Sequence, residues 1–430
     1  MRGFSETPRA ERLEHRKRTR RFIQVTVNVE PQSKNRRNTA ANDKPFHDAV
    51  MRALEEHGRR TPFRVPVAMR MHFQVSVDQA APQIDKLPKH YLDLLQVPRN
   101  LGDARSPKLL LQDDRLVKIL ICTYSFADDP GSAPYVFFEI STLTDFIQEL
   151  LLYSRLVSRG FDGLRDYIRL FSGYPGGEED QHNDPVRDYR DSLRQYGAAK
   201  GRYKLFYEAL LPSLQESAQH AILRRREPQP VQFAKIYECL IKRKNSSQDL
   251  IQAVAKMLRQ VFDTGIATVN LGPPAIHKGD SDQFREKVQS AIRAMRENNP
   301  ILDPLLTTLG ITILYVPPLT AQRIDIDNLA MRVIPYVRTE LKPPATYLHA
   351  LQNYKEGAIT QSVSDRLRRL RRVEKNQVTR YQVFEIPRLK DDPTDGRVSL
   401  LIHGRNEYSD PWQSLRNALN IWERHGPDSK

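Results

Sequence analysis

Two aspartates separated by a single residue, Asp325 and Asp327, lie within the segment Arg323-Ile-Asp-Ile-Asp-Asn-Leu. In an extended segment such carboxylates point the same way, and they repel each other unless a positive charge lies between them. A divalent cation would relieve this repulsion, and it would also activate water for attack on a phosphate. The alternative is an ordinary acidic start of a helix, which the helix dipole favours.

A second group of acidic residues lies in the N-terminal part of the chain. Asp85 belongs to Gln-Ile-Asp-Lys-Leu-Pro-Lys-His, and Lys89 follows it by four residues. Further along, Asp113 and Asp114 are adjacent and precede an apolar run. Three carboxylates and a lysine are the residue types needed to hold a cation and to neutralise a phosphate.

The elements that must position these residues occur in the same order twice. The first series is a strand at 22–28, a polar loop at 31–37, a helix from about 46, a strand at 65–77, the acidic motifs, and two strands joined by Asp128-Asp-Pro-Gly. The second is a strand at 266–270, a loop at 272–279, a helix from about 284, a strand at 310–316, the aspartate motif, and two strands joined by Asp391-Asp-Pro-Thr. This order indicates a long-period internal duplication.

Each series resembles the RusA-like Holliday junction resolvases, in which a strand, a Ser/Asn-Asn-Arg loop, a helix and a strand precede D-x-D-N-x-x-x-K, a helix, an acidic pair and a final hairpin. The resemblance covers most of the two end thirds and none of the middle. It implies an α+β fold with two RusA-like α/β domains joined by a helical middle region. The expected parts are a basic tail (1–20), a first copy (21–145), a helical connector (146–260), a second copy (261–405) with an insertion at 340–378, and a C-terminal tail (406–430).

Neither copy keeps the whole motif of the family. In the first copy Gln83 stands at the leading aspartate, Asp85 at the second and Lys89 at the lysine. In the second copy Asp325, Asp327 and Asn328 are present, but Met331 stands at the lysine. The acidic pair of the second copy falls near Glu374 and Lys375.

The resemblance implies a Mg²⁺-dependent endodeoxyribonuclease that cuts branched DNA, such as Holliday junctions in DNA recombination and repair, with the two copies forming a pseudo-dimer within one chain. Two metal sites are expected, one in each copy, and the first copy, which has more acidic residues and the lysine, is expected to contribute more to cleavage. The expected catalytic and metal-binding residues are Asp85, Asp113 and Asp114 with Lys89 in the first copy, and Asp325 and Asp327 in the second. The alternatives are a catalytically degenerate, structure-specific DNA-binding protein and a scaffold that recruits a partner.

The charge of the chain suits a nucleic-acid partner. The formal net charge is +15, and basic proteins attract polyanions. The expected DNA-binding residues are Lys34, Asn35, Arg36, Arg37, Lys278, Arg366, Arg368, Arg369, Arg371 and Arg372. The alternatives are a plain surface turn for the first group and a solvated helix face for the arginine tract.

Other classes of protein find little support. The two cysteines form neither a disulfide framework nor a zinc cluster, and Cys122, within an apolar strand, is expected in the core. No apolar run is long enough to cross a bilayer, so we expect a cytoplasmic protein with no membrane partner. The helical middle third is expected to be a spacer between the copies, or alternatively a platform for a partner.

Overall fold

A computed structural model gives the fold. It describes residues 7–33, 39–58, 61–76, 82–96, 110–127, 132–160, 184–224, 227–241, 268–275, 281–319, 323–342, 377–388, 392–404 and 410–425.

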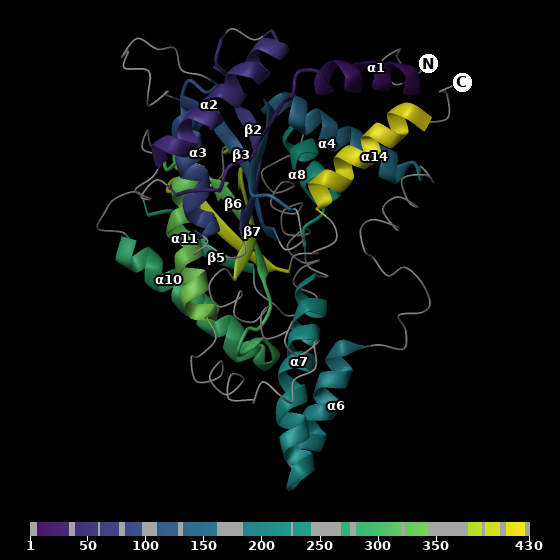
Figure 1. The fold of residues 1–430 in the computed structure, drawn as a ribbon, viewed down its shortest axis with the longest axis vertical. Coiled ribbons are helices and arrows are strands. Elements are labelled where there is room, and N and C mark those ends of the chain that lie inside the picture. The colour runs from purple at the N-terminus through teal and green to yellow at the C-terminus, as the bar shows by residue number, and fades with distance from the viewer. Residues whose placement is uncertain are drawn as a thin grey trace.

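A single mixed sheet of eight strands forms the centre of the protein, with helices on both faces (Figure 1). The strand order is β1-β4-β2-β3-β7-β6-β8-β5. The strands are β1 (Ile23–Val27), β2 (Val67–Ser76), β3 (Val117–Ala127), β4 (Tyr135–Thr142), β5 (Thr268–Gly272), β6 (Leu309–Val316), β7 (Val378–Glu385) and β8 (Arg397–His403). The fold is therefore a mixture of helices and strands, as the α+β prediction requires.

The two halves of the sheet have the same strand order. Each half runs from an outer strand through its antiparallel neighbour to a parallel pair, β2 with β3 in the first half and β6 with β7 in the second. The halves meet where β3 pairs antiparallel with β7, with Ile121 opposite Gln382. The strand order is thus repeated, and the two halves share one continuous sheet.

One face of the sheet carries helices that also occur in corresponding pairs. These are α2 (Thr39–Glu56) with α10 (Ser281–Asn298), and α3 (Leu87–Gln96), preceded by the short helix η2 (Ile84–Lys86), with α11 (Ile326–Leu341). Their apolar sides and the strands form one large hydrophobic cluster. Every residue of β6 is buried, as expected for a central strand covered on both faces, and Cys122 lies in the same cluster as predicted.

The opposite face carries α4 (Leu143–Ser158), α8 (Pro230–Ile241) and α14 (Pro411–His425), which form a second hydrophobic cluster with the strands. Helix α4 follows β4 and helix α14 follows β8, so each copy extends one helix beyond its predicted end. The expected C-terminal tail therefore contains a packed helix, anchored by the buried Trp412 and Trp422. The expected N-terminal basic tail contains α1 (Pro8–Thr19), whose buried His15 pairs with Glu149 of α4 at 2.5 Å.

The middle of the chain is helical where the structure describes it, but it is more than a spacer. Helices α4 and α8 build the second core, whereas α6 (Pro185–Ala198) and α7 (Arg202–Arg224) form a pair that projects from the body (Figure 1). The C-terminal part of α7 is anchored by Gln219, whose amide donates to the carbonyls of Ile301 and Pro304 at 2.7 Å each.

Several predicted features lie outside the described residues. They include the segment 343–376 with the arginine tract, Glu374 and Lys375, the turn at 128–131, and the basic loop residues Lys34–Arg37 and Lys278. No helix in the described ranges is long and apolar enough to cross a membrane.

Candidate metal centre

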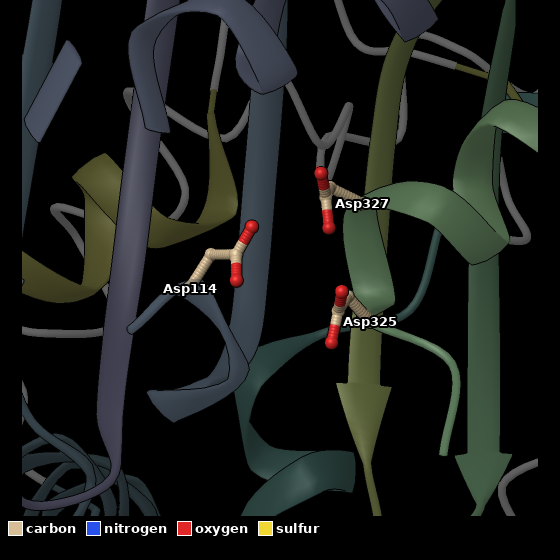
Figure 2. Close-up of side chains that lie close together, drawn as sticks. All are labelled: Asp114, Asp325 and Asp327. Atoms are coloured by element: carbon tan, nitrogen blue, oxygen red, sulfur yellow. The ribbon is translucent and has the colours of Figure 1, made fainter. Parts of the chain in front are cut away.

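Three aspartates from the two halves converge between β3 and α11. Asp114 begins the short helix η3 (Asp114–Leu116) that leads into β3, and Asp325 and Asp327 lie at the start of α11. One carboxylate oxygen from each lies within 4.8 Å of the others. Figure 2 shows Asp114 on one side and Asp325 and Asp327 on the other, with the carboxylates facing a common space.

The junction of the sheet explains this meeting. Helix α11 lies across the line where β3 and β7 pair, and it contacts β3, β7, α3 and η2. The apolar residues Leu329, Val333, Ile334 and Val337 recur at helical spacing and are completely buried, so the orientation of α11 is fixed. This packing brings the N-terminus of a second-half helix beside the entrance to a first-half strand.

Asp325 is not an ordinary helix cap. It occupies the N-cap position of α11, but its side chain makes no capping hydrogen bond to the backbone. Its Oδ2 accepts instead from the Asn328 amide at 3.2 Å, and the carboxylate turns towards the other two aspartates. The alternative explanation of the motif as a simple acidic helix start therefore does not account for the position of this side chain.

Asp327 is the most buried member of the group, with an exposed fraction of 2%. Its Oδ2 accepts no hydrogen bond from any described residue. A buried anionic oxygen without a hydrogen bond is costly unless a cation lies near it. The Nζ of Lys89 lies 3.4 Å from this oxygen, and a bound metal ion would be a second way to compensate its charge.

Lys89 of α3 is the cation nearest to the cluster. Its Nζ donates to Asp114 Oδ2 at 2.8 Å, and it lies 3.4 Å from Asp327 Oδ2 and 3.5 Å from Asp93 Oδ1. Burial alone would lower the pKa of this lysine, but the hydrogen bond that it donates to Asp114 and the surrounding negative charges outweigh burial and raise the pKa. Lys89 therefore stays protonated and connects the two sides of the site.

The three carboxyl groups differ in acidity. Burial raises the pKa of Asp327 despite the opposing charge of Lys89, and burial together with the charge of Asp114 raises the pKa of Asp325. Burial would also raise the pKa of Asp114, but its hydrogen bond and charge interaction with Lys89 lower it overall. In the absence of a metal, the lysine thus compensates Asp114 best and the two α11 carboxylates less well.

Exposed arginines flank the cluster. The Nε of Arg115 lies 3.6 Å from Asp325 Oδ1, and 74% of the Arg115 side chain is exposed. Arg323 is also exposed and precedes Asp325 by two residues. Guanidinium groups at the entrance to an acidic site suit an anionic substrate such as a phosphodiester.

The predicted grouping of site residues was wrong in two respects. Asp85 is not with Asp114: it is buried and pairs with Arg338 of α11 at 3.2 Å. Asp113 caps η3, where its Oδ1 accepts from the backbone N–H of Arg115 at 2.9 Å, and it does not join the cluster. Among the described residues there is therefore one acidic group, built from both halves, in place of the two expected.

Sequence reasoning missed the contributions of Arg115 and Asp93. Arg115 directly follows the acidic pair, and Asp93 follows Lys89 by one helical turn, so the spacing that identifies a helix neighbour signalled Asp93. No local pattern signalled that these residues would face a motif more than two hundred positions away.

Comparisons of the chain with protein-family models, with curated proteins and with solved structures find no match.

Proposed function

We propose that the protein is a metal-dependent endodeoxyribonuclease that acts on branched DNA, as a RusA-like pseudo-dimer within one chain. The observation that carries this proposal is the convergence of the carboxylates of Asp114, Asp325 and Asp327 on a common space, with Asp327 almost completely buried. Carboxylate oxygens are the preferred ligands of Mg²⁺ and Mn²⁺.

The residues present fit a hard divalent cation. The three aspartates would supply oxygen ligands, and a bound cation would polarise a phosphate oxygen and make water a better nucleophile. Lys89 would neutralise the charge that builds on the phosphate or on the leaving oxygen. Asn328 orients Asp325, and Arg115 at the rim would position the DNA backbone.

Support for a DNA substrate comes from charge and from the repeated architecture. The formal net charge of +15 favours a polyanion, and the two halves of the sheet repeat the same strand order about the β3–β7 junction. A branched DNA with two related arms suits a chain built from two such halves.

The second candidate is a DNA-binding protein without nuclease activity, in which the cluster is structural. The observation in its favour is that Lys89 already bridges Asp114 and Asp327, so an internal ion pair partly neutralises the group without a metal.

Cleavage of a four-way junction with each strand labelled in turn separates the two candidates. The wild type should cut in Mg²⁺ or Mn²⁺ and not in EDTA, and Asp114→Asn and Asp325→Asn should each abolish cutting while junction binding is kept. The matched control is Asp113→Asn, the same substitution at the adjacent residue outside the cluster. Salt-sensitive junction binding by a wild type that never cuts would leave only the DNA-binding candidate.

A further inference from the structure

The repeated architecture assigns a counterpart to every residue of the metal centre. In both halves the parallel strand pair has a register shift after its first residue pair, Val67 with Val117 and Leu309 with Val378. These shifts are common reference points for the two halves. Asp85 follows Val67 by 18 residues, and Asp327 follows Leu309 by 18 residues.

The same reference points identify the remaining counterparts. Gln83 corresponds to Asp325, and Met331 corresponds to Lys89. Counted from the first residues of β3 and β7, Lys375 corresponds to Asp114 in the sequence. At the mirror position, the place around Asp85 that corresponds to the metal centre, the amide of Gln83 thus replaces a carboxylate and the thioether of Met331 replaces the bridging lysine. Lys375 lies outside the described residues, so its correspondence to Asp114 is one of sequence alone.

Among the described residues, the carboxylate kept at the mirror position is that of Asp85, and it is already neutralised. Asp85 is buried and forms an ion pair with Arg338 at 3.2 Å, and the two unit charges cancel. The aspartate cluster carries three carboxylates against the charges of the part-buried Lys89 and of the exposed Arg115. Arg332, which is next to Met331, donates to the carbonyl of Ala275 and so is held elsewhere.

We propose that the described part of the chain has one divalent-cation centre, at Asp114, Asp325 and Asp327, and that Asp85 and Arg338 at the mirror position form a metal-free ion pair. The inference rests on the proposed function and sharpens it: each protein molecule breaks one phosphodiester bond per encounter with a two-fold DNA branch. The product is a nick on one strand, and paired incisions on two strands require a second protein molecule.

A Mn²⁺ titration followed by electron paramagnetic resonance of the free ion tests the number of centres without relying on activity. Asp325→Asn should remove all tight binding. Asp85→Asn combined with Arg338→Gln, which removes both charges of the mirror pair and leaves no buried ion unpaired, should bind as much Mn²⁺ as the wild type. Circular dichroism of each variant verifies the fold. Loss of about half of the bound Mn²⁺ in the double variant would overturn the inference.

A supercoiled plasmid that extrudes a cruciform tests whether each protein molecule makes a single incision. With protein below the plasmid concentration, one centre per chain predicts nicked circles as the first product, whereas two coordinated incisions give linear DNA directly. Linear DNA that forms without a nicked intermediate would contradict the single centre. If one class of Mn²⁺ site is found but no DNA is cut, the single centre stands as a binding site, and the nuclease proposal fails together with the nicking consequence.

Discussion

Substitution of Asp325 by asparagine should remove the stabilisation of the fold by a metal ion without lowering the stability of the metal-free protein. Asparagine keeps the shape and can still accept the hydrogen bond from Asn328, but it is a weak ligand for a divalent cation. Because burial and the charge of Asp114 raise the pKa of Asp325 in the folded state, the ionised form is disfavoured there relative to the unfolded chain. The stability contributed by this group is present at low pH and is lost as the pH rises through the raised pKa. At neutral pH without metal, Asp325→Asn should therefore be at least as stable as the wild type.

The magnitude of the metal effect follows from linkage. A ligand at 100 times its Kd stabilises the folded state by about 2.7 kcal/mol. With an unfolding entropy of roughly 2.1 cal/mol/K per residue, a chain of 430 residues should gain about 3 °C in Tm. Scanning calorimetry in EDTA and in Mg²⁺ should show this shift in the wild type and none in Asp325→Asn.

The matched control is Asp93→Asn, which makes the same charge change near Lys89, 3.5 Å away, but outside the three-aspartate group. It should keep the Mg²⁺-dependent shift. If Asp325→Asn kept the full shift, or if both variants lost it equally, the assignment of Asp325 as a metal ligand would be refuted.

Three further outcomes are expected. Lys89→Met, which copies its counterpart Met331, should abolish cutting. It should also enlarge the Mg²⁺-dependent rise in Tm, because the carboxylates of Asp114 and Asp327 lose their internal cation. An unchanged rise in Tm would show that the lysine does not compete with the metal. Mn²⁺ affinity measured by calorimetry should fall as the pH drops through the raised pKa values of Asp325 and Asp327. The fall should begin at a pH above the usual aspartate pKa of about 3.9. An affinity that does not change with pH in this range would argue against both residues as ligands. Glu227→Ala should lower the free energy of unfolding in urea by about 3 kcal/mol, since it leaves Arg380 buried without its main partner, whereas Glu14→Ala, at an exposed pair, should change it by less than about 1 kcal/mol.

The sequence by itself determined the repeated order of elements and the residues with metal-binding chemistry. Periodicity identified the strands around Ile311 and Val117, and the buried face of the helix after Asp327, because these depend on local alternation of apolar and polar residues. It did not determine the ends of the chain: α1 lies in the predicted basic tail and α14 in the predicted C-terminal tail, yet His15, Trp412 and Trp422 attach these helices to the body through partners far away in the sequence.

The partnership of the acidic residues was decided by the tertiary structure. From the sequence, Asp85, Asp113 and Asp114 formed one set and Asp325 and Asp327 another, because each set lay within one copy. The antiparallel pairing of β3 with β7 places the entrance to β3 beside the start of α11, so Asp114 joins the second-half aspartates while Asp85 pairs with Arg338. Local patterns carry no information about which strands of two copies become neighbours, since that choice depends on burying the apolar edges of both halves in one continuous sheet.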